Sequence, residues 1–257
     1  MMGWRAAILL GTIVLVVACA KMPPSANVPL VQERQNATQA APIGEGMEQG
    51  FTKERITLTT GDHVQLIGSY YDAPGDGVIL LHQFQRNRES WDPFAKELQQ
   101  RGLAAIAIDL RGHGESEGSL QAFSDQDFQA MLQDAEAAAT FLQKREKRVG
   151  AIVGASIGAN TALRYSSVHK TPAVLLSPGL TYHGIDINDT TSNAPTLIVA
   201  AKGDDYAYSS SVELERNNLF GEHRLLVVKG SQHGTDMLSE PGVAEAMLDF
   251  LQNETKR

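Results

Sequence analysis

The sequence has one cysteine, Cys19, among 257 residues, and this scarcity excludes any intramolecular disulfide. Positive charge is also in short supply, because 22 Lys and Arg face 30 Asp and Glu for a formal net charge of −8. A surface of this sign repels phosphate backbones, so nucleic acid is not expected as a partner. The apolar run near the N-terminus has 13 residues, 6–18, and is shorter than the roughly 20 that a membrane-spanning helix needs.

Signatures of bound cofactors are missing as well. The stretch G-A-S-I-G-A-N, residues 154–160, lacks the lysine of a phosphate-binding loop, and its glycines do not fit the dinucleotide pattern G-x-G-x-x-G. We therefore expect neither a nucleotide nor a metal cofactor.

The N-terminus has the composition of an export signal. Arg5 supplies a positive charge ahead of the 13-residue apolar run, so residues 1–18 are predicted to be a signal peptide. The stretch Val-Val-Ala-Cys that ends at Cys19 resembles the bacterial lipoprotein signal. This resemblance implies cleavage before Cys19, its acylation, and attachment of the protein to a membrane of the bacterial cell envelope. Ala20 in place of aspartate favours the outer membrane. The alternative is a chance cysteine in a plain signal peptide or membrane anchor.

Residues 19–50 are rich in Pro, Ala, Gln and Asn and show no sustained apolar period, which is typical of a flexible tether. The folded domain is expected over residues 51–257.

The pattern of that domain is an antiparallel hairpin followed by alternating strands and helices. Apolar runs without strict alternation indicate strands covered on both faces, and the intervening helices imply right-handed crossovers. The sequence thus predicts an α/β domain of three layers, α/β/α, with a mainly parallel sheet. The expected strands are 54–60, 63–71, 77–82, 103–109, 149–154, 173–177, 194–201 and 223–229, and the expected helices are 90–102, 125–148, 159–168, 209–220 and 240–254.

Ser156 lies between Gly154 and Gly158, where a predicted strand meets a predicted helix. Such a turn can present a serine oxygen on an exposed, strained bend, as a nucleophile requires. The alternative interpretation is a small residue in a tight turn.

A serine nucleophile needs a base that is held by a carboxylate, and later loops offer both groups. Asp204 follows the strand at 194–201, with Asp205 as its rival, and His233 follows the last strand. At this point both aspartates remain candidates for the acid, and the alternative interpretation is an acidic pair at the start of a helix.

Together and in this order, the motifs around these residues resemble the α/β-hydrolase superfamily, in its esterase and dienelactone-hydrolase-like branch, over residues 51–253. The stretches that carry the resemblance are LLHQFQRNRESW, IDLRGHGES, VGASIGAN, APTLIVAAKGDDYAY and GSQHGTDML. It implies a catalytic triad of Ser156, Asp204 and His233. Asp204 is preferred over Asp205 because it lies three positions past Ala201, as the acid does past a glycine or small residue in the family pattern. It also implies an oxyanion hole from the backbone N–H groups of Ile157 and Phe84, although Gln83 stands where relatives usually carry glycine.

The segment 178–194 has 17 residues, too few for the helical cap that many relatives carry. We therefore expect no cap domain and an open, shallow site for small or extended acyl compounds. The predicted function is hydrolysis of carboxylic esters through an acyl-enzyme. The alternatives are cleavage of thioesters, amides or peptides, acyl transfer, and a non-catalytic binding lipoprotein on a hydrolase fold. The sequence gives no indication of the oligomeric state.

Overall fold

A computed structural model describes residues 51–217 and 221–256. The predicted signal peptide (1–18), the tether (19–50) and Cys19 lie outside the described residues. In the described part of the chain, no helix is both long enough and apolar enough to cross a membrane.

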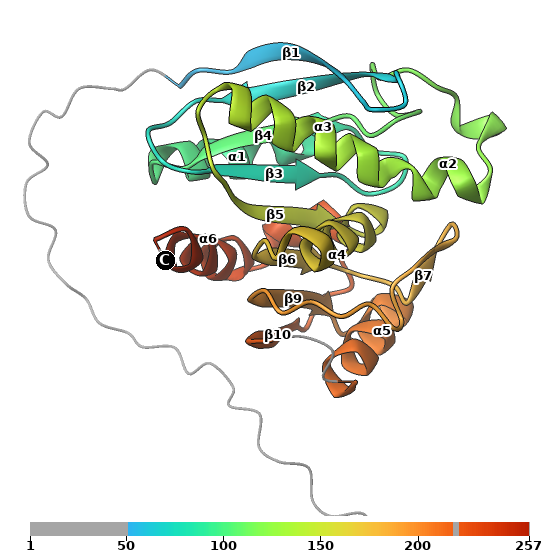
Figure 1. Ribbon diagram of the computed structural model, residues 1–257. Helices are drawn as coiled ribbons and strands as arrows, with labels where there is room; N and C mark the ends of the chain where they lie inside the picture. Colours follow the sequence, from blue (N-terminus) through green and yellow to red (C-terminus); the bar gives the residue numbers. More distant parts are fainter. Residues whose placement is uncertain (1–50, 218–220, 257) are drawn as a thin grey trace, which may run out of the picture. The chain divides into compact units, whose positions relative to one another are not determined.

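Eight strands of the described chain form one large sheet in the order β1-β2-β4-β3-β5-β6-β9-β10 (Figure 1). The strand β2 runs antiparallel to β1 and β4, and the other neighbouring pairs are parallel. The expected mainly parallel sheet with an N-terminal antiparallel hairpin is therefore confirmed. The strands are β1 Glu54–Thr59, β2 Gln65–Tyr71, β3 Gly77–Leu81, β4 Ala104–Ile108, β5 Val149–Ala155, β6 Ala173–Leu176, β9 Thr196–Ala201 and β10 His223–Val228.

Burial along the strands follows their place in the sheet. All residues of the central strands β3, β4, β6 and β9 are buried, as apolar runs covered on both faces require. The edge strand β1 instead alternates between exposed and buried residues in its second half.

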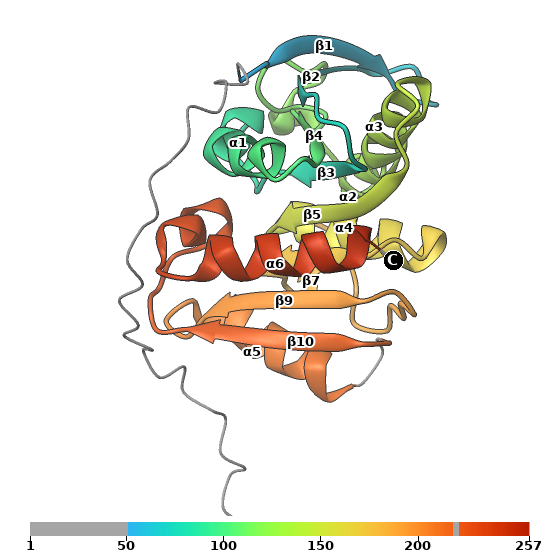
Figure 2. The ribbon, with the colours of Figure 1, turned by 90° about the vertical axis from the view of Figure 1, so that its left-hand side faces the viewer.

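Helices cover both faces of the sheet, which completes the three layers (Figure 2). The helices α1 (Asp92–Gln100) and α6 (Val243–Thr255) contribute side chains to one core. The helices α3 (Met131–Lys144), α4 (Ile157–His169) and α5 (Asp205–Arg216) contribute to the other. Short 3-10 helices occupy Arg88–Trp91, Leu120–Ala122 and Gly234–Ser239.

Three elements differ from the sequence expectation. The single helix expected over 125–148 is two helices, α2 (Asp125–Gln129) and α3, with a break at Ala130. The Phe128 ring before the break stacks on His183, and Phe128 and Met131 on its two sides both belong to the core. The helix expected at 209–220 begins earlier, at Asp205. Within 178–194, β7 (Thr181–Tyr182) and β8 (Ile185–Asp186) form a small antiparallel hairpin.

Buried ion pairs hold the turn after β4. The fully buried Asp109 carboxylate accepts hydrogen bonds from the backbone N–H groups of Arg88, at 2.7 Å, and Glu115, at 2.8 Å, and it also pairs with the Arg88 guanidinium. In the same turn, Arg111 Nε donates to Asp134 Oδ1 of α3 at 2.8 Å. Since all these groups are paired, the turn is fixed beside the loop that follows β3.

Candidate active site

Ser156 occupies the junction between β5 and α4 in a strained conformation, with φ 53° and ψ −116°. Its flanking glycines are required by close backbone approach. A Cβ on Gly154 would lie 2.0 Å from the carbonyl oxygen of Gly158, and a Cβ on Gly158 would lie 2.5 Å from that of Leu81. Only glycine fits at either place, so the two glycines of G-x-S-x-G permit the sharp strand-to-helix turn at Ser156.

A second pair of predicted residues meets beyond β9 and β10. The Nδ1 atom of His233 lies 2.6 Å from Oδ2 of Asp204. When the aspartate is ionised, Nδ1 carries the proton and Nε2 is the nitrogen that can accept another. The rival Asp205 is an exposed residue of the first turn of α5. The geometry therefore selects Asp204 as the partner of the imidazole.

One cavity of about 290 Å³ brings these loops together, and the side chains around it come from four separate segments of the chain. Its lining consists of Gln83, Phe84, Ser156, Ile157, Tyr182, His183 and His233. Both residues predicted to donate oxyanion N–H groups thus border the same space as Ser156. Ile157 is the first residue of α4, so its N–H has no carbonyl partner within the helix and lies at the positive end of the helix dipole.

The sequence did not identify Tyr182 and His183 as site residues. They lie on the β7–β8 hairpin, where Tyr182 lines the cavity together with Ser156 and its hydroxyl donates to the Ser177 carbonyl oxygen at 3.5 Å. Burial raises the pKa of Tyr182, so its phenol is neutral. The His183 ring stacks on Phe128 at 4.4 Å between ring centroids. The only sequence signal for them was that a tyrosine and a histidine stand side by side in the polar segment 178–194, which follows a strand.

His82, in the loop after β3, braces that loop from behind the cavity. Its Nδ1 lies 2.8 Å from the carbonyl oxygen of Gln83, and its Nε2 accepts a hydrogen bond from the N–H of Leu110 at 3.0 Å. Burial, with His113 beside it, lowers the pKa of His82 to about 4. The imidazole is therefore neutral at pH 7 and donates from Nδ1.

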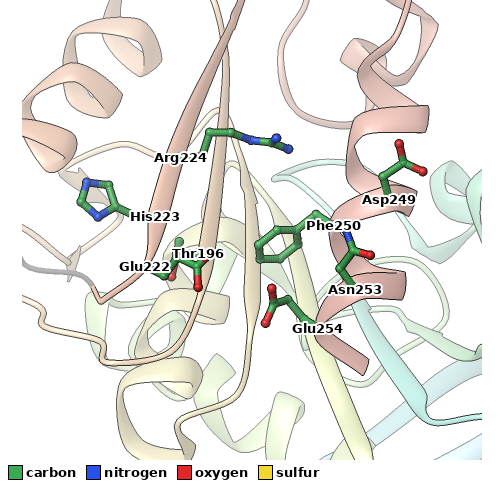
Figure 3. A pocket seen from close by; sticks show the side chains of 8 residues that line it. All are labelled: Thr196, Glu222, His223, Arg224, Asp249, Phe250, Asn253 and Glu254. Atoms are coloured by element: carbon green, nitrogen blue, oxygen red, sulfur yellow. The ribbon is translucent and has the colours of Figure 1, made fainter. Parts of the chain in front are cut away.

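A larger cavity, of about 600 Å³, lies between the amino ends of β9 and β10 and the helix α6 (Figure 3). Its lining includes Thr196, Arg224 and Phe250. Ser156, Asp204 and His233 follow the carboxyl ends of their strands, so this cavity belongs to the other end of the sheet.

Comparison with known proteins agrees with this architecture. Residues 72–202 match the hydrolase family described as serine aminopeptidase, S33. A Bacillus subtilis protein named as AB hydrolase superfamily protein YisY is 30% identical over 119 residues, which make up 46% of this chain and 39% of that protein. The thiohydrolase aneE of Aspergillus aculeatus is 27% identical over 132 residues, 49% of this chain and 41% of that protein. The chain spans about two fifths of the length of these curated relatives.

Solved structures show the same fold over most of the chain. An esterase of Pyrococcus furiosus has a TM-score of 0.66 at 20% identity and covers 80% of this chain and 94% of its own. The dienelactone hydrolase of Anabaena variabilis has a TM-score of 0.63 at 17% identity, over 79% of this chain and 96% of its own. With the family match over half of the sequence, the chain belongs to the α/β-hydrolase superfamily, in the family described as serine aminopeptidase, S33.

Proposed function

We propose that this protein is a serine hydrolase that cleaves carboxylic esters, with Ser156 as nucleophile, His233 as base and Asp204 as the group that orients the base. The observation that carries the proposal is the contact of 2.6 Å between His233 and Asp204 beside a cavity that Ser156 also lines. A strained serine, an imidazole and a carboxylate that orients it are the parts that acyl transfer to water requires.

In the first step the Ser156 oxygen attacks the ester carbonyl while His233 Nε2 takes the serine proton. The resulting imidazolium is stabilised by Asp204 and then gives its proton to the departing alcohol, which leaves an acyl-serine. In the second step water attacks the acyl group, His233 takes the water proton and returns it to the Ser156 oxygen, and the carboxylic acid is released. Both steps pass through an oxyanion that the N–H groups of Ile157 and Phe84 are proposed to stabilise.

The cavity favours compact, uncharged acyl groups. Its volume is about 290 Å³, and none of the described residues that line it is Asp, Glu, Lys or Arg. An aminopeptidase must bind the charged terminal amine of its substrate, for which an acidic side chain in the cavity is the usual partner. The lining therefore supports an ester substrate over a peptide with a free amino terminus, although the family description includes peptide cleavage. Thioesters, other amides and acyl transfer use the same triad and remain as further candidate reactions.

The test is reaction of the purified protein with a fluorophosphonate probe, together with turnover of p-nitrophenyl acetate. We expect the label on Ser156, its loss in Ser156→Ala, and a steep decrease in His233→Ala. A folded protein that neither reacts with the probe nor cleaves the ester would contradict the proposal and favour a non-catalytic binding protein. Preference for long-chain triglycerides over short esters would contradict the proposed substrate class.

We also propose that the protein is held on a membrane of the bacterial cell envelope by lipid on Cys19. Support comes from the sequence alone: a short apolar run ends at the only cysteine of the chain. Two or more acyl chains anchor a protein much more firmly than one. Mass spectrometry of the membrane-associated protein should find an acylated Cys19 at the mature N-terminus, and an unmodified Cys19 or cleavage elsewhere would contradict the anchor.

A further inference from the structure

The side chain of Gln83 joins two loops that meet at the cavity. One is the loop after β3, which carries the Phe84 N–H, and the other follows β10 and carries His233. We propose that Gln83 is a positioning residue, which fixes the oxyanion donor relative to the catalytic base. This inference rests on the proposed serine hydrolase function.

Three hydrogen bonds make the connection. The Gln83 Oε1 atom accepts from the Thr235 N–H at 2.9 Å and from the Thr235 hydroxyl at 2.7 Å. The Gln83 Nε2 atom donates to the carbonyl oxygen of His233 at 3.3 Å. The side chains of Gln83 and Thr235 are both buried, at 6% exposure for each residue, so these bonds are little weakened by competition with water.

The backbone of Gln83 is held as firmly as its side chain. Its carbonyl oxygen is 2.8 Å from His82 Nδ1 and accepts from the Arg86 N–H at 3.1 Å. This carbonyl and the Phe84 N–H belong to the same peptide unit, which is planar and trans. Because the two groups point in opposite directions in a trans unit, bonds that fix the carbonyl also fix the direction of the Phe84 N–H.

The His233 loop is shaped to accept this side chain. Gly234 has a positive φ of 59°, and a Cβ there would lie 2.7 Å from Cδ of Gln83. The Gly234 N–H donates to the Ser177 hydroxyl at 3.0 Å, which holds the loop from its other side. The loop therefore passes directly over the Gln83 amide, and its contacts with Gln83 and Ser177 set its position.

This arrangement matters most in the transition state. The oxyanion must accept a hydrogen bond from the Phe84 N–H while His233 holds the serine proton. The loops that carry Phe84 and His233 must therefore be correctly placed relative to each other at the same moment. In the ground state the ester carbonyl carries little charge, so binding of the ester depends less on the relative position of the two loops. Loss of the Gln83 contacts should consequently lower kcat and leave KM nearly unchanged.

The experiment compares four variants of the full chain: Gln83→Met, Thr235→Val, their combination, and the matched control Gln99→Met. Gln99 also donates three hydrogen bonds from its amide, to Thr52 and Asp72, but it lies in α1 away from the cavity. Active sites are counted with the fluorophosphonate probe, and kcat and KM for p-nitrophenyl acetate are expressed per active site. The unfolding midpoint of each variant is measured in parallel.

We expect Gln83→Met to lower kcat about 30-fold with KM within about threefold, somewhat less than the effect of removing an oxyanion donor outright. Thr235→Val should lower kcat about fivefold, because one of the two bonds to Gln83 Oε1 remains. The double variant should match Gln83→Met, since Thr235 acts through Gln83. Gln99→Met should keep the wild-type kcat.

Three results would overturn the inference. The first is a kcat per active site for Gln83→Met within about twofold of wild type. The second is a decrease of kcat in the double variant equal to the product of the decreases in the two single variants. The third is a decrease of kcat in Gln99→Met as large as that in Gln83→Met. All three presuppose an active wild type and leave the proposed function standing. A wild type without ester turnover or probe labelling would instead refute the proposed function, and the positioning role with it.

Discussion

At the scale of single residues, two adjacent aspartates follow β9 and differ in what they reach. Asp204 lies 2.6 Å from the His233 imidazole, whereas Asp205 is exposed in the first turn of α5. Replacing Asp204 by Asn keeps the size of the side chain but removes the charge that stabilises the imidazolium and favours the wrong tautomer. The two residues therefore provide a matched pair.

We expect Asp204→Asn to lower kcat for p-nitrophenyl acetate by about 10³–10⁴-fold, and Asp205→Asn to change it less than about twofold. Both variants should unfold close to the wild-type midpoint, because neither leaves a cavity. Steady-state kinetics with active-site titration is the measurement. A strong loss in Asp205→Asn, or none in Asp204→Asn, would show that the acid of the triad has been wrongly assigned.

The residues of the proposed triad were predictable because each follows a strand at a position marked by glycine or by a short polar run. Gln83 was noticed only as a departure from glycine, since its function depends on contacts to Thr235, 152 residues away. Nothing local in the sequence specifies such a contact. Tyr182 was missed for a related reason: its approach to Ser156 depends on a hairpin whose strands have two residues each.

At the scale of elements, Asn160 and Tyr206 are two of the side chains that anchor the β7–β8 hairpin. Asn160 of α4 donates from Nδ2 to the carbonyl oxygens of Gly179 and Ile185, both at 2.9 Å, and accepts from the Gly179 N–H at 3.2 Å. Tyr206 of α5 donates to the Thr181 carbonyl oxygen at 2.9 Å. Asn160 is fully buried and Tyr206 is half exposed, so the first anchor is the stronger.

We expect Asn160→Ala to lower the free energy of unfolding by about 2–3 kcal/mol, because it leaves buried backbone groups without partners. A looser hairpin should also admit longer acyl chains. The ratio of kcat/KM for p-nitrophenyl octanoate over butyrate should rise by at least about threefold. Tyr206→Phe is the comparison variant. Because Tyr206 is the more exposed anchor, its loss should change this kcat/KM ratio less than Asn160→Ala does. An unchanged ratio in a folded Asn160→Ala would mean that the hairpin does not limit the acyl chain.

The strands were predicted better than the helices, and the reason is physical. A strand buried on both faces needs a continuous apolar run, and such runs stand out in the sequence at β3, β4, β5 and β9. Helix limits depend on weaker local signals. The pattern over 125–148 predicted one helix, and packing of the Phe128 ring against distant residues such as Phe84 and His183 accompanies the break at Ala130.

At the scale of the whole molecule, acid stability should depend on carboxylates paired with buried arginines. Asp62 pairs with Arg111, and hydrogen bonds from that guanidinium lower the pKa of Asp62 to about 2. A folded-state pKa below the unfolded value adds stability above the unfolded pKa, and this stability is lost as pH falls toward the folded pKa. For Asp62 the window runs from about 4 down to about 2.

We expect Asp62→Asn to lower the free energy of unfolding at pH 7 by about 1 kcal/mol, a value reduced for solvent screening because the side chain is 34% exposed. Its difference from wild type should vanish as pH falls through the window. Urea unfolding across this pH range tests both points. Asp249→Asn, which removes a pair whose carboxylate is 60% exposed, should have a smaller effect. A constant difference at all pH values would contradict the ionic origin of the effect.

The hydrophobic cores of the described chain begin at Ile56, and the sequence predicts that residues 19–50 are a flexible tether. A fragment of residues 51–257 should therefore unfold at the same temperature as a longer chain that starts at Cys19, and should have the same kcat for p-nitrophenyl acetate. The first strand, β1, does contribute to the core. The strand β1 pairs with β2 along six residues and contributes buried Ile56 and Leu58 to the core.

Removal of β1, in a fragment of residues 61–257, exposes the edge of β2 and the core beneath it. Burial of Ile56 and Leu58 accounts for about 1.5–3 kcal/mol each, so their loss takes about 3–6 kcal/mol from a domain whose total stability is typically about 5–15 kcal/mol. We expect this fragment to unfold well below the 51–257 fragment or to aggregate through the free edge. Thermal unfolding followed by circular dichroism compares the two. Equal midpoints for both fragments would place the start of the domain after β1, whereas a destabilised 51–257 fragment would place it before residue 51.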